Sequence, residues 1–409
     1  MHGDSPLRKK PQTRCGNQEA AIRKPVPNPS AARTAIVALK LTGFRNYIGL
    51  ALRLDGRPVV LTGPNGAGKT NLLEAVSFLS PGRGLRGAAL EAVARQGGDG
   101  AWAVAATIEN AAGAVDVGTG VALGTEGPEA RRSVRVNHAP ARSTDALLEH
   151  LRVIWLTPAM DGLFTGPASD RRHFLDRAVL AIDRSHGTRV NAFEKAMRGR
   201  NKLLAENGPD ANGQWLDAIE TEMAELGVAI AAARREWASL IAGLIAASDC
   251  DSAFPWAEIA LEGLLEHELD GHPASVVEDL YRAELEGERP IDARAGRTLA
   301  GPHRSDLRVR HGPKRAAAET CSTGEQKALL IGLPLAEARL SAQLSGETPI
   351  VLLDEIAAHL DGVRRAALFD ALHTLGCQAF LTGTDADIFA PLGDRAERFA
   401  VRDAQLTPA

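Results

Sequence analysis

The sequence predicts an α/β protein whose mixed sheet carries flanking helices and is interrupted by an inserted α-helical arm. Two observations support this fold class. A glycine-rich loop stands between a short apolar strand and a helix at residues 58–76, and a second apolar strand at 349–353 ends in two carboxylates. Between them, residues 168–285 show helical periodicity. The chain must therefore leave a compact core and return to it.

The composition is that of a globular protein. Hydrophobic residues make up 44% and charged residues 24% of the 409 positions, and the formal net charge is −4. A nucleic-acid binder with this charge needs a locally basic surface. No apolar run reaches the ~18 residues of a membrane span. The scattered cysteines favour a reducing cytoplasm over a zinc site or a disulfide framework: Cys15, Cys250, Cys321 and Cys377.

Residues 1–34 differ from the rest of the chain. They carry seven lysines or arginines against two acidic residues, and five prolines interrupt any helix. No apolar core follows the positive charges, which argues against a secretory signal. We expect a disordered basic extension that either binds acidic partners weakly or has no binding role.

The first half of the core begins with strands. Residues 35–41 form a first strand, residues 42–47 a turn with two aromatic side chains, and residues near 49–54 a second strand. Asp55-Gly56 then predicts a hairpin into the strand at 58–61, because Asp-Gly between apolar runs is a hairpin signal.

Residues 63–70 match the phosphate-binding pattern G-x-x-x-x-G-K-[ST] in full. Glycines let the backbone wrap around a phosphate, and the following helix N-terminus adds a partial positive charge. Lys69 is expected to reach the β- and γ-phosphates, and Thr70 to bind Mg²⁺. An accidental glycine-rich turn is the alternative, and the flanking strand and helix argue against it. The predicted nucleotide-binding residues are Gly63, Pro64, Asn65, Gly66, Ala67, Gly68, Lys69 and Thr70.

The alternating pattern of residues 101–137 predicts antiparallel strands beside the nucleotide, and residues 153–158 predict a buried strand that ends at a proline. The helical block follows. Residues 170–207 carry nine basic and five acidic residues, whereas residues 211–290 carry seventeen acidic and four basic ones. Residues 215–244 are alanine-rich and predict one long helix, or two. Strands return at 307–310, 350–353 and 379–381.

Asp354 and Glu355 close the strand at 349–353. In P-loop ATPases an aspartate at this position holds Mg²⁺, and an adjacent glutamate can orient or deprotonate the attacking water. We therefore predict Asp354 as the metal-side residue and Glu355 as the general base. Many parallel strands end near an acid, so the prediction depends on the phosphate-binding loop upstream. The 285 residues between Lys69 and Asp354 again indicate an insertion within one ATPase core.

A third motif, residues 321–327, precedes an apolar helix and is similar to the signature motif of ABC-type ATPases. That resemblance implies that Ser322, Gly324 and Glu325 cap the γ-phosphate held by a partner subunit, so that two heads clamp two ATP molecules. The alternative is a simple helix cap at the serine. Leu360-Asp361 resembles the D-loop that crosses the dimer interface in these ATPases, and a helix-terminal aspartate is an equally good interpretation of Asp361.

These motifs together resemble the RecF family, which are SMC-like ABC ATPases without the long coiled coil. Residues 41–47 match its L-x-x-F-R-N-Y start, and residues 63–71 match its P-loop. Residues 166–176 and 301–307 are similar to its G-x-P-x-x-R-R-x-F-L-D and G-P-H-R-x-D-L segments. The resemblance spans residues 36–401 and divides the chain into head halves at 35–165 and 296–409 around an inserted domain at 166–295.

The resemblance implies a DNA-binding ATPase switch. ATP and Mg²⁺ would close a homodimer on gapped DNA at a junction of single and double strands, and slow hydrolysis would reopen it. Partners would be RecO and RecR, with loading of RecA and a part in the SOS response. Where the family has two aspartates, this chain has Asp354-Glu355, the commoner ABC arrangement.

DNA contacts are expected from the basic stretch after residue 170. The alternative for these charges is a solvated helix face or a structural ion-pair network. A regulatory scaffold that binds protein partners without DNA also remains open, favoured by the negative net charge, whereas the inserted arm argues against a transporter subunit. The candidate DNA-contacting residues are Arg171, Arg172, Arg198, Arg200 and Lys202.

Overall fold

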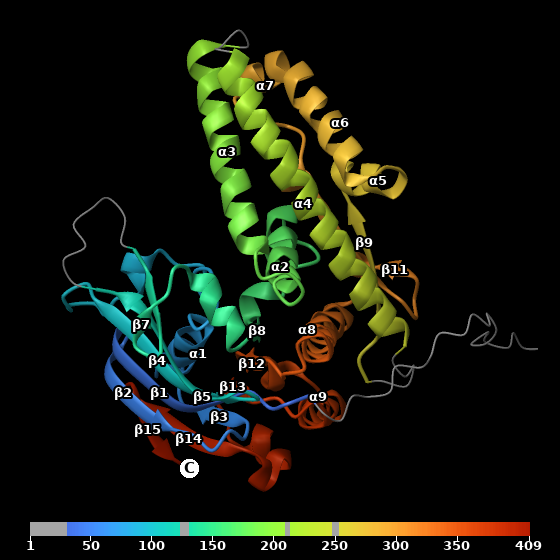
Figure 1. Ribbon diagram of the computed structural model, residues 1–409. Coiled ribbons are helices and arrows are strands. Elements are labelled where there is room, and N and C mark those ends of the chain that lie inside the picture. The colour runs from blue at the N-terminus through green and yellow to red at the C-terminus, as the bar shows by residue number, and fades with distance from the viewer. Residues whose placement is uncertain (1–30, 123–130, 209–212, 248–252) are drawn as a thin grey trace, which may run out of the picture.

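The computed structural model describes residues 31–122, 131–208, 213–247 and 253–409. It consists of a head built on two six-stranded sheets and a helical arm that projects from the head (Figure 1). The predicted α/β class with an inserted arm is confirmed. Most of the predicted basic extension, residues 1–30, lies outside the described residues. Its last residues do not: Ala32 pairs with Glu347, and the Thr34 backbone N–H donates to Thr348 Oγ1 at 3.2 Å. The predicted extension is therefore too long at its C-terminal end.

The first sheet is antiparallel throughout. Its strand order is β2 (Tyr47–Arg53), β1 (Ala35–Phe44), β4 (Trp102–Asn110), β5 (Gly113–Val121), β6 (Ser133–Val136) and β7 (Ala139–Pro140). Alternate residues of β4 are buried, as expected of a sheet with one face in the core. The antiparallel strands predicted from the alternation over 101–137 are confirmed.

The second sheet runs β15 (Gln405–Pro408), β14 (Glu397–Arg402), β3 (Val59–Thr62), β13 (Ala379–Gly383), β12 (Ile350–Leu353) and β8 (Val153–Leu156). All neighbours are parallel except β14 and β15. Every residue of β8 and β12 is buried, because helices cover both faces of a parallel sheet. Helix α1 (Lys69–Ser77) packs between the two sheets, and α8 (Thr323–Ser345) and α9 (Gly362–Leu375) cover the other face.

The hairpin predicted at Asp55-Gly56 is wrong. Strand β2 pairs with β1 in the first sheet, whereas β3 pairs with β13 and β14 in the second. The Asp55-Gly56 turn therefore carries the chain from one sheet to the other. It is fixed by Asp55, whose backbone N–H donates to Glu397 Oε1 at 2.9 Å and whose side chain pairs with Arg57. A local turn signal cannot distinguish a hairpin from a crossing between layers.

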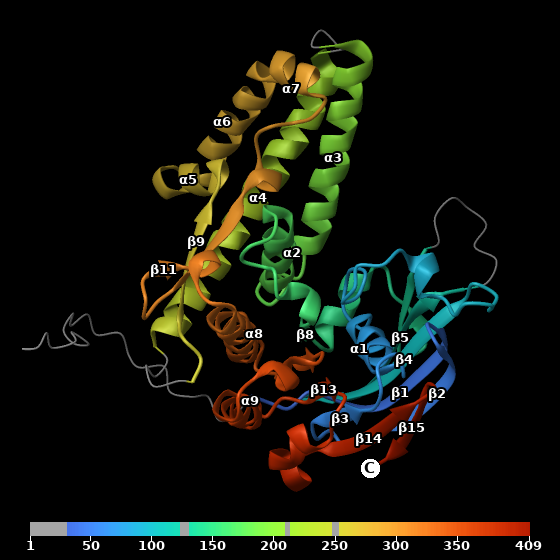
Figure 2. The same cartoon turned by 180° about the vertical axis from the view of Figure 1, so that it is seen from behind.

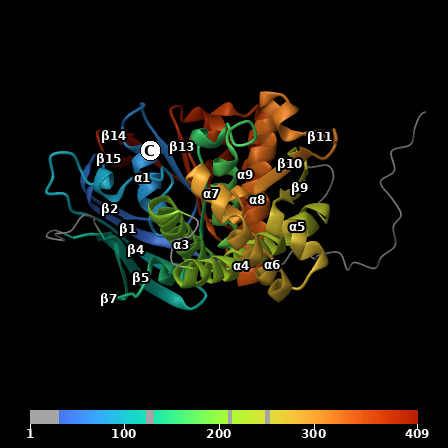
Figure 3. The same cartoon turned by 90° about the horizontal axis from the view of Figure 1, so that it is seen from above.

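The arm contains α2 (Ala168–Val179), α3 (His186–Asn207), α4 (Gly213–Ala246), α5 (Leu264–Gly271), α6 (Ala274–Gly287) and α7 (Arg289–Ala295). Helix α4 spans 34 residues, so of the two arrangements expected for residues 215–244, one long helix or two, the structure has the single helix. Seen from behind, α5 and α6 lie on the side of α4 away from α3 (Figure 2). From above, α4 lies between α3 and α6 (Figure 3).

One strand in the arm was not predicted from the sequence. β9 (Ala257–Glu262) pairs with β10 (Asp306–His311), which pairs with the short β11 (Ala316–Ala317). The β9 sequence Ala-Glu-Ile-Ala-Leu-Glu consists mainly of helix-forming residues, so its pairing with β10 overrides local preference. The strand predicted at 307–310 therefore belongs with the arm's sheet and not with the two head sheets. The predicted domain boundary at residue 296 falls between β9 and β10, which pair with each other.

Glu337 of α8 is buried without a hydrogen bond to its Oε2 among the described residues. Burial raises the pKa of the Glu337 carboxyl from 4.5 to about 7, and the nearby Arg177 guanidinium opposes this rise only in part. The folded state therefore keeps a proton that the unfolded chain releases between these two values. The contribution of Glu337 to the free energy of unfolding falls as the pH rises through this window. Above about pH 7 the full cost of burying the ionised carboxylate is present.

We expect Glu337→Gln to stabilise the protein by roughly 1–3 kcal/mol at about pH 8 and to have little effect at about pH 5, because glutamine keeps the shape and never ionises. Urea unfolding at both pH values measures the difference. Glu236→Gln, at an exposed position of α4, is the control and should change neither value. An equal gain at both pH values would show that packing, and not ionisation, sets the effect.

Candidate nucleotide site

The predicted phosphate-binding loop joins β3 to α1 near the middle of the second sheet. Gly63 and Gly68 have φ angles of 152° and 116°. A Cβ at Gly63 would lie 2.2 Å from the Val401 carbonyl oxygen, and one at Gly68 would lie 2.8 Å from Asn46 Nδ2. Both positions therefore require glycine for their backbone conformation and for close approach of neighbouring chain.

The turn between β1 and β2 holds this loop from one side. Tyr47 donates from its hydroxyl to the Gly68 carbonyl at 3.1 Å, and Asn46 accepts through its Oδ1 from the Asn71 side chain in the first turn of α1. The Asn71 Nδ2 to Asn46 Oδ1 distance is 2.7 Å. The sequence indicates residues 45–47 as part of a turn and of a family-like motif. Nothing local in the sequence indicates that they brace a loop some 20 residues away.

A buried carboxylate supports α1 behind the loop. Glu74 is fully buried and accepts from Arg45 Nε at 2.8 Å and from Arg86 Nη1 at 2.8 Å. Two guanidinium groups face one carboxylate, which leaves net positive charge beside the helix that begins at Lys69. This arrangement favours an anion near the loop, because it adds to the positive end of the helix dipole.

Lys69 is folded back onto its own loop. Its Nζ donates to the Gly63 carbonyl at 2.7 Å and to the Pro64 carbonyl at 3.0 Å. Burial lowers the pKa of Lys69, and the Glu355 and Asp354 carboxylates oppose this effect. The ammonium group is therefore held by acceptors that an anionic ligand can replace.

Thr70, Asp354 and Thr382 meet at the carboxyl ends of β12 and β13. Thr70 Oγ1 lies 3.0 Å from both carboxylate oxygens of Asp354, and Thr382 Oγ1 donates to Asp354 Oδ1 at 2.8 Å. The structure thus brings together the two residues that the sequence predicted as metal-side groups. Thr382 orients Asp354 through this hydrogen bond.

Glu355 follows in an unusual backbone conformation. Its φ is 57°, and its backbone N–H donates to Thr382 Oγ1 at 2.8 Å. A positive φ at a glutamate is strained and persists only where neighbouring contacts hold it, a feature that clusters at functional sites. Thr382 thus fixes both carboxylate residues through one hydroxyl, which accepts from Glu355 and donates to Asp354.

These residues fit a nucleotide with Mg²⁺. A hydroxyl and a carboxylate are hard oxygen ligands, and Mg²⁺ usually takes only one or two protein ligands beside phosphates and water. Across the described ranges, three or more His, Cys, Asp or Glu residues nowhere gather as a separate metal site. Thr70 and Asp354 would hold the metal, which would neutralise phosphate charge, and Lys69 would bind the phosphates.

The signature residues lie apart from the loop of their own chain. Ser322 is the N-cap of α8, and its backbone N–H donates to Glu325 Oε2 at 3.1 Å, as in a capping box. The Glu325 carboxylate also pairs with Lys314, and the Lys314 bond is the main reason that the pKa of Glu325 falls to about 2. No hydrogen bond or ion pair recorded between described residues joins 322–325 to 63–70. Both the cap and a site in trans therefore stay compatible with Ser322.

Asp361 caps α9 by accepting from the Arg364 backbone N–H at 2.8 Å. Arg364 in turn donates to the Gly324 carbonyl at 3.4 Å. The segment predicted as the D-loop is therefore tied to the predicted signature through one arginine. The helix-terminal role of Asp361 is observed, and its role at a dimer interface stays a prediction.

Two of the five candidate DNA-contacting residues are wrong, because their side chains are buried in ion pairs. Arg171 donates from Nε to Asp306 Oδ1 at 2.7 Å, and Arg200 donates to Glu220 at 2.8 Å and to Asp292 at 2.6 Å. Arg172 is half-buried and donates to the Ser305 carbonyl. Arg198 and Lys202 are exposed beside glutamates one turn away, so they stay candidates.

The fold and the loop define a P-loop protein of the ABC-ATPase class. Across the described residues, no helix is both long and apolar enough to cross a membrane. The family model described as the RecF/RecN/SMC N terminal domain matches residues 35–403. The chain belongs to the RecF family.

Curated relatives agree with this assignment. The "DNA replication and repair protein RecF" of Mesorhizobium japonicum is 58% identical over 377 residues, which cover 92% of this chain and 98% of the relative. Its namesake in Allorhizobium ampelinum is also 58% identical and is covered in full. A solved structure titled "recombination mediator protein RecF-ATP in RecFOR pathway" superposes with a TM-score of 0.78 at 22% identity, over 92% of this chain and 98% of that one.

We expect Arg200→Ala to destabilise the arm by about 3–5 kcal/mol, because it leaves the buried Asp292 without its ion-pair partner and the buried Glu220 with Arg289 alone. Arg198→Ala removes an exposed pair on the same helix and should cost less than about 1 kcal/mol. Urea unfolding measures both. An Arg200→Ala protein that is as stable as the parent would contradict the structural role.

Proposed function

We propose that ATP binding closes two copies of this chain into a dimer that holds gapped DNA at a junction of single and double strands. The observation that supports this proposal best is the division of the site. The loop, Thr70 and Asp354 form one half, whereas Ser322 caps α8 and Gly324 lies in its first turn, and no hydrogen bond or ion pair between described residues joins these two to that half. A second copy can supply the missing side, as the resemblance to ABC ATPases implies.

Each residue of the loop half has a distinct role. Residues 63–68 wrap the phosphates with backbone N–H groups, Lys69 leaves the Gly63 and Pro64 carbonyls for the phosphates, and Thr70 and Asp354 hold Mg²⁺. Thr382 keeps Asp354 oriented. Bound Mg²⁺ would neutralise charge on the phosphate oxygens.

Glu355 is the general base in this proposal. The hydrogen bond from its backbone N–H to Thr382 holds Glu355 next to Asp354, the metal-side residue. There the Glu355 carboxylate orients the attacking water and accepts a proton from it. Turnover is slow because hydrolysis serves to reopen the dimer, and the enzyme acts as a switch gated by the γ-phosphate.

DNA binding requires a local basic surface on a chain of net charge −4. Lys195, Arg198 and Lys202 lie at i, i+3 and i+7 on α3 and are exposed, so they share one face of the arm. The relatives' role in DNA repair supports DNA as the ligand. The solved RecF structures are described as those of a protein in the RecFOR pathway, which supports RecO- and RecR-like partners for this chain. RecA loading and SOS induction follow as the proposed outcome.

A protein-binding scaffold is the second candidate. It is favoured by the burial of Arg171 and Arg200, which removes two basic residues from any DNA surface. A gel shift with gapped duplex DNA, with and without ATP, separates the two. DNA binding should appear with ATP and fall steeply between roughly 50 and 200 mM salt, because phosphate contacts release counterions. The absence of any shift would favour the scaffold.

We expect Ser322→Arg to bind ATP as a monomer and to fail to dimerise, because the change lies outside the loop half of the site. Lys69→Ala should lose both ATP binding and dimerisation. Light scattering with ATP and Mg²⁺ measures the dimer, and a fluorescent ATP analogue measures binding in the monomer. Loss of monomer binding in Ser322→Arg would contradict the trans role of the signature.

We expect Glu355→Gln to retain ATP and to stay in the closed dimer, with turnover reduced by about 10²–10⁴-fold as for removal of a general base. Single-turnover hydrolysis and the lifetime of the dimer measure the two effects. Glu347→Gln, at a half-buried position just after α8 in the same head, is the control and should keep parental turnover. Normal turnover in Glu355→Gln would remove Glu355 as the base.

A further inference from the structure

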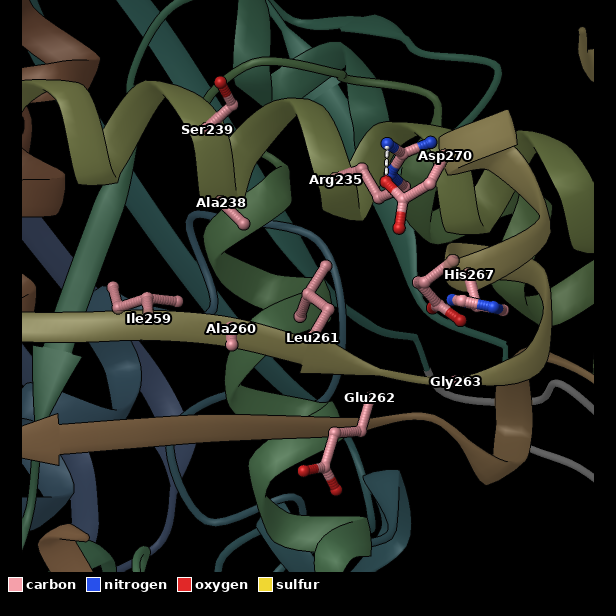
Figure 4. Close-up of a pocket in the computed structure, with 11 residues that line it drawn as sticks. Arg235, Ala238, Ser239, Ile259, Ala260, Leu261, Glu262, Gly263, His267 and Asp270 are labelled. Atoms are coloured by element: carbon pink, nitrogen blue, oxygen red, sulfur yellow. Dashed lines mark hydrogen bonds and ion pairs between the residues drawn. The ribbon is translucent and has the colours of Figure 1, made fainter. Parts of the chain in front are cut away.

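The arm has an open groove between α4, β9 and α5, with a cavity volume of about 490 Å³ (Figure 4). Each carboxylate that lines it within the described residues already has an arginine partner. The pairs are Asp270–Arg235, Glu262–Arg308 and Glu266–Arg234. The groove therefore leaves no carboxylate to select a charged ligand. Unpaired charge of one sign gathers instead on the head, where β6 and β7 form one edge of the first sheet.

Two arginines share the outer face of that edge. The Ala141 backbone N–H donates to the Val134 carbonyl at 2.9 Å, which continues the antiparallel pairing of β6 and β7. Ser133 and Arg142 are therefore the next opposed pair. Arg135 lies two residues from Ser133 on β6, and side chains two apart on a strand share a face. Arg135 and Arg142 are thus diagonal neighbours on the face opposite the buried Val134.

A third arginine joins them from the start of β6. Arg132 turns inward, where its guanidinium donates to Thr119 Oγ1 at 2.7 Å and to the Gly82 carbonyl at 2.6 Å and lies 5.1 Å from the centre of the Phe78 ring. Because neighbouring side chains of an extended chain point to opposite faces, Arg131 points outward. The inward contacts of Arg132 fix the position of this edge against the chain that follows α1.

Arg131, Arg135 and Arg142, here called the arginine cluster, have no acidic partner. All three are exposed, and their guanidinium groups make no recorded hydrogen bond or ion pair with another described residue. A carboxylate on the same face of β5, Asp116, instead accepts from Thr107 Oγ1 at 2.7 Å and faces His138 at 3.7 Å. Like charges on neighbouring strands repel. A bound anion would relieve this repulsion, and guanidinium groups match the geometry of phosphate.

The arginine cluster lies near the foot of α3. Thr188 of α3 donates from Oγ1 to Asp145 Oδ2 at 2.6 Å, and Asp145 is three residues beyond Arg142. Lys195, two turns further along the same face of α3, is exposed and has no recorded ion pair with a described residue. In Figure 1, β7 and α3 lie on the same side of the molecule, away from α8 and α9. A ligand bound to the cluster can therefore also reach the basic face of α3.

The rest of this outer face has the shape for a phosphate backbone and not for exposed bases. Gly118 and Ala105 stand beside Arg135 in register on the next two strands, so the surface next to it is flat. Proteins that hold single strands stack the bases on aromatic side chains. The aromatic residues in the described strands of this sheet are all buried: Phe44, Tyr47 and Trp102. The face therefore favours double-stranded nucleic acid, whose phosphates are exposed and whose bases are stacked inside.

We propose that the arginine cluster binds backbone phosphates of the double-stranded part of the DNA. The three guanidinium groups contact phosphates on the outer face of the first sheet, and Lys195 extends the contact onto the arm. This inference rests on the DNA binding proposed above and adds the head's own contacts to it. Because the three arginines belong to one chain, their contact with the duplex requires neither ATP nor a second copy.

The test measures binding of a fluorescent blunt duplex of about 20 base pairs to the full chain without ATP, by anisotropy between roughly 50 and 200 mM salt. Changing all three arginines of the cluster to glutamine should weaken binding by at least about tenfold at roughly 100 mM salt. It should also reduce the slope of log affinity against log salt by about two to three, because each contact with a B-DNA phosphate contributes about 0.9 to that slope. A loss of affinity through misfolding does not predict this change of slope.

The matched control changes Arg53, Arg294 and Arg297 to glutamine. These arginines are also exposed, and their replacement removes the same amount of charge away from the cluster. The control should change the salt slope by less than about one half. Urea unfolding checks that the cluster variant is folded, and its midpoint should equal or exceed that of the parent because the variant removes mutual repulsion.

Several results would overturn the inference. These are no binding of the duplex by the parent chain, a parental salt slope in the cluster variant, an equal loss in the control, or tighter binding of a single strand than of the duplex. Displacement of the duplex by a polyglutamate peptide of equal charge would assign the cluster to an acidic protein instead. The assay contains no ATP, whereas the proposed dimer switch is tested by ATP-dependent dimerisation and by the gel shift with gapped DNA. Failure of one is therefore distinguishable from failure of the other.

Discussion

The hydrogen bonds between Thr70 and Asp354 set the architecture of the molecule. The two residues lie 284 positions apart and meet through 3.0 Å contacts at the ends of β3 and β12, with only β13 between these strands. Because neighbouring strands of this sheet are parallel, each return to the sheet needs a crossover. The longest excursion, between β8 and β12, contains the whole arm. The arm is thus an insertion that leaves the sheet and must close again at Asp354.

The sequence predicted the parts of the site that depend on short-range pattern. A strand, the glycine loop Gly63–Thr70 and a helix follow each other within 20 residues, and a second apolar strand leads directly to Asp354. The long helix α4 was equally visible, because alanine-rich periodicity is a local property. The partners of these residues were not predictable in this way. Thr382 holds Asp354 and Glu355 from a neighbouring strand, and Tyr47 braces Gly68 from the other sheet.

The errors have a common physical cause, which is that tertiary contacts outweigh local preference. The helix-forming residues of β9 become a strand because β10 pairs with them. Asp55-Gly56 connects two sheets and not two paired strands. Arg200 was a plausible DNA contact by charge alone, yet it is buried between Glu220 and Asp292. A basic residue in a sequence carries no mark that distinguishes an internal ion pair from a surface charge.

A series of ion pairs joins the arm to the predicted signature. Arg171 of α2 pairs with Asp306, and Arg308, on the same strand, contacts Glu262 of β9 at 2.7 Å and Glu319 at 3.9 Å, just before Ser322. Lys314, between β10 and β11, pairs with Glu325 inside the signature itself. The arm's small sheet therefore cannot move relative to the start of α8 without separating these charges. Exposed ion pairs such as those of Arg308 and Lys314 are individually weak. Together they affect the position of α8 because β10 is anchored by the buried Arg171–Asp306 pair.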